Sequence, residues 1–350
     1  MKDSRKSVGR VRISDVATAA GVSVATVDRV INGRDPVRRP TAEKVLAAAE
    51  ALGFRAGPSL ARRLASPERP ARRFGFLLLQ KHRSFYQRLA GDIARACEAY
   101  LPARIRPRIL HLDNLAPTAV AGQIRALGRE VDALAVVAAN HPLITRAVEQ
   151  LASEGVPVFA LISEITAARP IGYVGLDNHA VGRTAAWFIT QMAKQPGRVG
   201  ILVGTHRFRC QDLNESGFRS YFREHAPGFD VIEPGATLED AAMAAELTRH
   251  LLAKEPDLRG LYMAGGGISG ALAALRDCPH AREIIVIGND RTEAAHAGLL
   301  DGYIRLLLTH PLGTICDTLI ARMAEAAQGS ADALRPALSP VFIETPESIR

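Results

Sequence analysis

Residues Gly21 to Arg34, GVSVATVDRVINGR, hold a distinctive set of polar side chains. If Val24 to Ile31 is a helix, Val27, Val30 and Ile31 share one face and can pack on a neighbouring helix. The opposite face then carries a guanidinium, a carboxylate and an amide among small apolar groups, from Val24, Ala25, Asp28, Arg29 and Asn32. An arginine on such a face is suited to enter the major groove of DNA, whereas an acid beside it needs an explanation.

Two other helices are expected to hold this face outward. Gly21 can end a first helix in the left-handed conformation, and Ser23 is a good amino-terminal cap for the second. The apolar positions that predict the first helix are Val16, Ala19 and Ala20. A third helix is indicated by Pro40 near its first turn, Gly53 as its cap, and a stripe of Val45, Ala48, Ala49 and Leu52. Helices joined by a glycine-containing turn describe an all-α helix-turn-helix head.

The positive charge of the chain is concentrated around this head. Residues 1–73 contain 16 Lys/Arg and 7 Asp/Glu, a net charge of +9, whereas the remaining residues contain 28 and 29, a net of −1. This asymmetry favours a polyanion-binding head on a neutral body. The alternative is a solvated basic tail.

The head resembles the lactose/galactose repressor family of bacterial regulators, through DVATAAGVSVATVDRVING and VRRPTAEKVLAAAEALGF. The resemblance implies that Val24 and Ala25 choose the operator sequence and that Arg29 reads a base edge. It implies contacts to the DNA backbone from Ser23, Thr26 and Asn32. Arg12 and Arg38 stand where the family usually has Thr or Ser, so the caps of the first and third helices depart from the pattern.

Asp28 lies one turn from Val24, where many family members have serine. It can accept a hydrogen bond from a cytosine amine. Alternatively, it pairs with a nearby arginine and lowers nonspecific affinity. We favour the second hypothesis because a short aspartate reaches a base edge less easily than arginine does.

The linker GPSLARRLASPERPARR contains one short helical patch, Ser59 to Ala65, which is expected to order only on binding. By resemblance it is the hinge helix of the family, with Arg62 on DNA and Leu64 wedged into the minor groove. A solvated linker with Leu64 packed on the body is the alternative. Ala56-Gly57-Pro58 replaces the usual Pro-Asn before the hinge.

The rest of the chain alternates short apolar runs with amphipathic helices, which predicts an α/β body with parallel sheets. Ten strands suit two doubly wound lobes, with a ligand in the cleft between them at the carboxyl ends of the strands. The predicted domains are 1–56 (head), 57–73 (hinge and linker) and 74–350 (body). The first lobe is expected at about 74–163 and 306–330, and the second at about 164–305 and 331–350. The predicted strands are 74–79, 104–112, 133–139, 156–162, 198–204, 230–234, 260–265, 283–289, 303–309 and 341–345.

The body resembles, more loosely, the periplasmic-sugar-binding-protein fold that the family uses for its effector, through FYQRLAGDIARAC, YVGLDNHAVGRTAAWF, ESGFRSYF and VIGNDRTEAAHAGLLDGYI. The resemblance implies effector contacts at Phe85, Tyr86, Asn140, His141, Asn214 and Asp290. Phe85 could instead be core, Asp290 an ordinary turn residue and His141 a helix cap.

Two departures from the family pattern bear on the ligand. Asn214 replaces a frequent arginine, so an anionic effector is disfavoured. Gly265-Gly266-Gly267 is better interpreted as a tight turn than as a phosphate loop, since no Gly-Lys-Ser/Thr follows.

Other functional classes find little support in the sequence. The cysteines, Cys97, Cys210, Cys278 and Cys316, form no C-x-x-C, and no nucleophile elbow or metal-ligand spacing is present, so we expect no cofactor, metal or catalytic residue. No apolar run approaches 18 residues and no signal peptide is evident, which predicts a cytoplasmic protein without a membrane partner. The sequence therefore predicts an effector-controlled repressor, a homodimer or higher oligomer on operator DNA. An enzyme fused to a helix-turn-helix and an architectural DNA binder are the alternatives.

Overall fold

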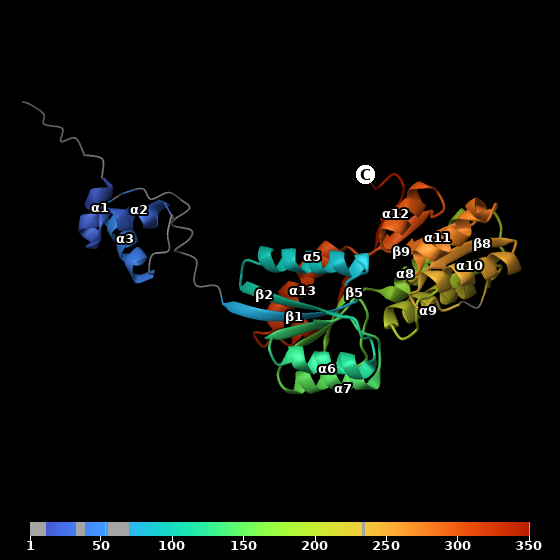
Figure 1. Cartoon of the computed structure of the whole chain (residues 1–350), viewed down its shortest axis with the longest axis horizontal. Coiled ribbons are helices and arrows are strands. Elements are labelled where there is room, and N and C mark those ends of the chain that lie inside the picture. The colour runs from blue at the N-terminus through green and yellow to red at the C-terminus, as the bar shows by residue number, and fades with distance from the viewer. Residues whose placement is uncertain (1–11, 33–38, 53, 55–69, 233–234, 350) are drawn as a thin grey trace, which may run out of the picture. The chain divides into compact units, whose positions relative to one another are not determined.

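The computed structural model describes residues 12–32, 39–52, 54, 70–232 and 235–349 (Figure 1). The chain divides into two compact units, Met1–Pro70 and Ala71–Arg350. Because Gly53, Arg38, Arg62 and Leu64 lie outside the described residues, the expectations for them stay predictions.

The head contains the three expected helices, α1 (Ile13–Ala20), α2 (Val24–Asn32) and α3 (Arg39–Ala51). Their small core consists of Val16, Ala17, Val27, Val30, Val45 and Ala49. Of the stripe predicted for α1, Val16 is buried and Ala20 packs against the core, whereas Ala19 is exposed and Ala17 is buried in its place. The predicted inner face of α2 is confirmed at Val27 and Val30.

Local capping explains where the first two helices begin and end. Gly21 has φ 66° and ends α1, as predicted. The Ser23 hydroxyl accepts a hydrogen bond from the Thr26 amide at 3.2 Å, which caps α2. Arg12 has no side-chain oxygen that could cap α1. The Asp15 carboxylate accepts a hydrogen bond from the Arg12 backbone amide at 2.8 Å.

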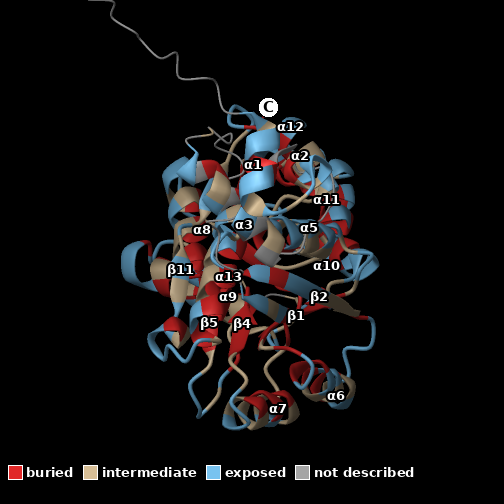
Figure 2. Ribbon diagram, turned by 90° about the vertical axis from the view of Figure 1, so that its left-hand side faces the viewer, coloured by how far each residue is buried: buried red, intermediate tan, exposed pale blue. Residues whose placement is uncertain are grey.

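The body is built on two six-stranded sheets with the orders β11-β5-β4-β3-β1-β2 and β12-β10-β9-β8-β6-β7. All pairings are parallel except that of β10 with β12. Long apolar runs suit strands covered on both faces, and β4 and β5 are buried throughout (Figure 2). The strands are β1 (Ala71–Leu79), β2 (Arg104–Leu112), β3 (Ala133–Val136), β4 (Val158–Leu161), β5 (Gly172–Leu176), β6 (Arg198–Leu202), β7 (Asp230–Val231), β8 (Leu258–Met263), β9 (Ile285–Asn289), β10 (Leu306–Thr309), β11 (Ala337–Ser339) and β12 (Phe342–Glu344).

Helices cover both sheets. On the first, α6 (Pro117–Gly128) packs with α7 (Pro142–Ser153), and α5 (Ser84–Ala99) packs with α13 (Leu312–Ala326) on the other face (Figure 1). On the second, α8 (Asn178–Met192) packs closely with α9 (Arg209–His225), and α10 (Ala241–Lys254) packs with α11 (Ile268–Arg276). The short α12 (Glu293–Leu300) contacts α11. No helix in the described part of the chain is long and apolar enough to cross a membrane.

Sheet membership corrects the predicted lobe boundaries. Strand β5, expected in the second lobe, pairs with β4 in the first sheet, because no helix separates the two strands and Gly172 lies opposite Phe159. Strand β10, expected in the first lobe, pairs with β9 in the second sheet. Strand β11 returns to the first sheet beside β5. The chain therefore passes between the lobes three times, after β5, after β10, and between β11 and β12.

Candidate functional site

A cavity of about 460 Å³ lies between the lobes, at the carboxyl ends of strands from both sheets. The loops that follow β1, β4, β6, β8, β9 and β10 all contribute to it. This is the position in which open parallel sheets bind ligands. The second sheet with its loops and helices supplies most of the wall and the first sheet with its loops and helices supplies the rest, so the cavity depends on both lobes.

Aromatic rings form one wall of the cavity. Phe85 and Tyr86 begin α5, and their rings meet edge to face with centroids 5.1 Å apart. Phe85 also contacts the His310 ring at 5.7 Å. Burial, followed by the negative charge of Glu239, raises the pKa of Tyr86 well above its usual value, so its phenol stays neutral. Such a wall can stack on the C–H face of a small molecule while its phenol offers a hydrogen bond.

Asp290 and His310 form a polar pair beside this wall. Asp290 follows β9 with φ 61°, and its Oδ1 accepts hydrogen bonds from the backbone amide of His310 at 3.1 Å and from His310 Nδ1 at 2.7 Å. Because Nδ1 carries the hydrogen, neutral His310 has Nε2 as an acceptor. Nε2 is buried and has no hydrogen-bond partner among the described residues.

Asn214 supplies a second unpartnered acceptor. It lies on α9, it is 3% exposed, and its Oδ1 has no hydrogen-bond partner in the described structure. A buried carbonyl oxygen left without a donor costs about 1–3 kcal/mol. The Asn214 and His310 side chains both line the cavity and both offer acceptors. The arrangement therefore suits a ligand that donates hydrogen bonds, as hydroxyl groups do.

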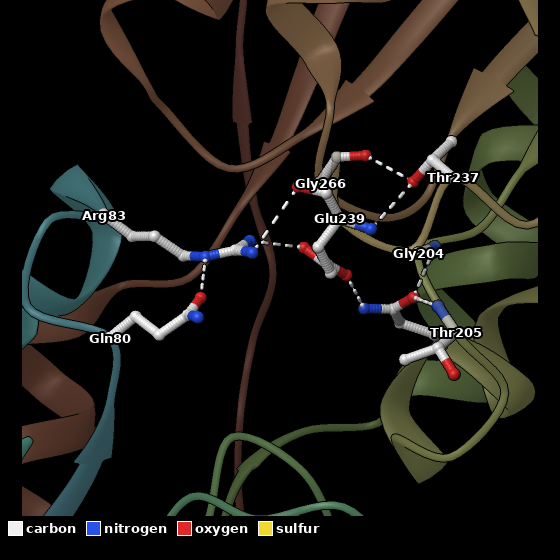
Figure 3. Close-up of polar contacts among 8 residues, drawn as sticks. Gln80, Arg83, Gly204, Thr205, Thr237, Glu239 and Gly266 are labelled. Carbon is white, nitrogen blue, oxygen red and sulfur yellow. Dashed lines mark hydrogen bonds and ion pairs between the residues drawn. The ribbon is translucent and has the colours of Figure 1, made fainter. Parts of the chain in front are cut away.

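An ion pair crosses the cavity from lobe to lobe (Figure 3). Arg83 Nη1 lies 3.0 Å from Glu239 Oε2, and Arg83 Nε donates to Gln80 Oε1 at 2.8 Å. On the far side, Gln211 Nε2 donates to Glu239 Oε1 at 2.6 Å. The orientation of the Gln211 amide is fixed because its Oε1 accepts from the backbone amides of Gly204 and Thr205.

The structure brings together four of the six residues predicted to bind an effector, namely Phe85, Tyr86, Asn214 and Asp290. The other two do not line the cavity. The Asn140 side chain exchanges hydrogen bonds with Thr166, and His141 Nδ1 accepts from the Leu143 amide, which caps α7. The effector role of all six stays a prediction.

The charged or amide residues of the cavity that sequence reasoning missed include Arg83, Gln211, Glu239 and His310. Arg83 lies two residues before the predicted Phe85, and His310 directly follows a predicted strand. Both positions could have been found from the rule that strand ends form the site. Gln211 and Glu239 had no comparable signal. No group of three or more His, Cys, Asp or Glu side chains in the described ranges could hold a metal ion.

On the head, the predicted outer face of α2 is accessible. Val24 is 52% exposed, and Ala25 and Arg29 are also exposed. The Ser23 and Thr26 hydroxyl groups lie 2.8 Å apart at the start of the helix, and Asn32 is its last residue. Asp28 is partly buried.

The fold is shared with solved sugar-binding proteins. A solute-binding protein from Burkholderia graminis in complex with D-arabinose is 18% identical, with a TM-score of 0.72 over 80% of this chain and 97% of that chain. One from Actinobacillus succinogenes with bound D-allose is 16% identical, with a TM-score of 0.71 over 79% of this chain and 98% of that chain.

Several curated relatives are transcriptional regulators, and others are periplasmic binding proteins. The chain is 27% identical to the HTH-type transcriptional regulator reg1 of Streptomyces lividans over 276 residues, 76% of this chain and 70% of the relative. It is 33% identical to catabolite control protein A of Priestia megaterium over 174 residues, 48% of each chain. Residues 12–56 match the model of bacterial regulatory proteins of the lacI family, and residues 74–331 match that of the periplasmic binding protein domain. The chain therefore belongs to the LacI family of ligand-controlled, DNA-binding transcriptional regulators, with a periplasmic binding protein domain as its body.

Proposed function

We propose that the cavity binds a neutral sugar or polyol, and that this ligand controls repression by altering the affinity of the head for operator DNA. The observation that carries the proposal is a pair of buried atoms with no hydrogen-bond partner among the described residues, Asn214 Oδ1 and His310 Nε2, beside the aromatic wall; Asn214 Oδ1 is an acceptor, and so is His310 Nε2 when the ring is neutral. A hydroxyl group can donate to each of them, whereas a carboxylate or phosphate offers mainly acceptors. Phe85 covers the apolar face of the ring, and Asp290 accepts from further hydroxyl groups.

Two observations support the choice of a sugar. The Burkholderia and Actinobacillus proteins of the same fold bind D-arabinose and D-allose. The cavity volume of about 460 Å³ lies in the range of small-molecule sites. Asn140 and His141 lie outside the cavity wall, so we expect them to influence the ligand at most indirectly.

On the DNA side, we propose that α2 enters the major groove and that the hinge segment acts in the minor groove. Arg29 reads a base edge, Val24 and Ala25 set the sequence preference, and Ser23, Thr26 and Asn32 contact the DNA backbone. Leu64 and Arg62 of residues 57–73 contact the minor groove. The net charge of +9 in residues 1–73 supplies the salt-dependent part of binding.

The proposed assembly is a cytoplasmic homodimer, or a larger assembly built from it. Two heads then read the two halves of a near-palindromic operator, since the symmetry of the protein matches that of the DNA. The three passages of the chain between the lobes allow a hinge motion, which the ligand biases by contacting both lobes at once.

A panel of neutral sugars and polyols tests this function. We expect at least one member to raise the thermal midpoint of the full chain and to change its affinity for operator DNA, measured by fluorescence anisotropy. NMR of the recovered compound should show it unchanged, because we propose that the protein is not an enzyme. A ligand that stabilises the protein while leaving operator affinity unaltered contradicts the proposed control, and conversion of the compound contradicts the absence of catalysis.

A further inference from the structure

The most unusual feature of the cavity is that Glu239 reaches into it from a strained loop. Leu238 and Glu239 have φ values of 53° and 63°, a left-handed conformation that is uncommon for residues other than glycine. Such strain persists only where the surroundings enforce it, and it concentrates at functional sites. The conformation aims the Glu239 carboxylate at Arg83 on the opposite lobe.

Two glycines make room for this carboxylate. A Cβ atom at Gly204 would lie 1.7 Å from Glu239 Oε1, and one at Gly266 would lie 1.9 Å from Glu239 Oε2. Any side chain at either position would therefore expel the carboxylate. Together with the hydrogen bond from Gln211, the two glycines form a fitted seat for a negative group.

The seat lies where an anionic ligand would otherwise be attracted. Helices α5, α8, α9, α11 and α12 all begin at the cavity, and helix amino termini carry partial positive charge. Arg83 would add a full positive charge. Each of its three nitrogens nevertheless already donates a hydrogen bond, Nε to Gln80 Oε1, and Nη1 and Nη2 to the Glu239 side chain and backbone carbonyl.

The other charged groups of the wall do not restore an anion site. Arg83 and His310 are its basic residues, and His310 is paired with Asp290. Glu293 adds a third carboxylate at the start of α12. An incoming carboxylate or phosphate would have to displace Glu239 from Arg83 or lie among acids.

From this geometry we propose that Glu239 is the residue that makes the cavity select neutral polyhydroxylated ligands over acidic ones. It occupies the anion position and neutralises Arg83. This inference rests on the proposed ligand function for its biological meaning, but masking of Arg83 can be tested without knowing the effector. Loss of the Glu239 charge should turn the cavity into an anion site.

The test uses inorganic sulfate as the probe and the full-length chain. Glu239→Gln keeps the shape of the side chain and removes its charge. We expect sulfate to bind this variant about tenfold more tightly than the wild-type chain, the effect of one charge-assisted hydrogen bond. Binding is measured by calorimetry at constant ionic strength, with chloride as the reference salt, so that anion binding by the basic head contributes equally to every protein.

Two matched variants isolate the cause. Glu293→Gln removes a charge from the same cavity without freeing Arg83, and it should bind sulfate as the wild type does. The double variant Arg83→Gln/Glu239→Gln should lose the gain. Equal sulfate binding by the wild type and Glu239→Gln, an equal gain in Glu293→Gln, or a gain that survives in the double variant would each overturn the proposal.

A third variant decides the question even if Glu239→Gln does not fold. Arg83→Gln should leave the sulfate affinity of the otherwise wild-type chain unchanged, because Glu239 already occupies that arginine. A clear loss of sulfate binding would show that Arg83 binds anions despite Glu239, and would overturn the proposal.

Matched neutral and acidic sugars then test selectivity itself. D-galactose and D-galacturonate, and D-glucose and D-glucuronate, differ in one carboxylate. Stronger stabilisation of the wild type by the acidic member of a pair would contradict the role of Glu239. A failure of every sugar to bind would count against the proposed function, while the sulfate comparison would still decide whether Glu239 masks Arg83.

Discussion

Replacing Asn214 by leucine should stabilise the ligand-free protein and abolish its response to ligand. The buried Oδ1 of Asn214 has no hydrogen-bond partner in the part of the chain that the structure describes, and an unsatisfied buried acceptor costs about 1–3 kcal/mol. Leucine has the same branching and number of heavy atoms, and the adjoining cavity leaves space for its methyl groups. It also favours a helix interior by a few tenths of a kcal/mol relative to asparagine. We therefore expect a gain of about 1–2 kcal/mol.

The gain should appear as a thermal midpoint raised by roughly 2–8 °C, given about 2–4 °C per kcal/mol for a domain of this size class. Trp187, the single tryptophan, lies on α8 with its ring 4.8 Å from that of Phe188, and its fluorescence is expected to report unfolding. Affinity for a stabilising sugar should fall about tenfold to a hundredfold, because a ligand hydroxyl loses its acceptor in a closed site.

A control on the same helix separates burial from helix propensity. Ser216 is exposed on α9, so Ser216→Leu should change stability by less than about 0.5 kcal/mol and leave ligand binding unaltered. If Asn214→Leu lowers the stability of the ligand-free protein and leaves the ligand response intact, the reasoning about its unpartnered oxygen is refuted.

Three other predictions concern single acidic residues. Asp290→Asn should keep the fold, because asparagine tolerates the left-handed backbone at this position, and should weaken the effect of the ligand on DNA binding; an unchanged dose response would remove Asp290 from the site. Asp28→Ser should tighten binding to operator and random DNA alike and reduce the ratio between them; weaker binding to the operator alone, with lost preference at one base pair, would show that Asp28 reads cytosine. Burial raises the pKa of Glu215, but hydrogen bonds from Arg219 and His206 outweigh it and lower the pKa below 4.5. A lowered folded-state pKa contributes stability above pH 4.5 that is lost as the pH falls through the folded value, so acid unfolding below that pH should be less steep in Glu215→Gln; identical pH profiles would contradict this contribution.

The sequence predicted the architecture because buried apolar residues recur with the period of the helix or strand that contains them. The alternation of apolar runs and amphipathic helices was sufficient for two parallel sheets, and the inner face of α2 followed from Val27 and Val30. Strands β5 and β11 were missed because the first follows β4 without a helix between them and the second has only three residues. They pair with each other at the sheet edge, so missing both also misplaced the lobe boundaries.

The candidate site was predictable only where chemistry coincides with a strand end. Asp290 satisfied that condition, whereas Glu239 lies in a loop where the left-handed residues, Leu238 and Glu239, are neither glycine nor asparagine and so gave no sequence signal. Its partner Arg83 is 156 residues away along the chain, and a contact between residues so far apart gives no signal in the local sequence pattern. Contacts between lobes depend on how two sheets face each other, and single-sequence periodicity does not contain this information.

The three passages between the lobes also place His310 at the expected hinge. His310 lies on the passage from β10 to α13, so it belongs at once to the cavity wall and to one of the three connections about which we propose that the lobes rotate. Because three connections join the lobes, we expect the lobes to rotate about a hinge and not to slide past each other. A ligand that displaces His310 by a fraction of an ångström is therefore expected to produce a larger displacement far from the hinge. The lobe that would move contains β1, whose first residue, Ala71, follows directly on the segment that leads from the head.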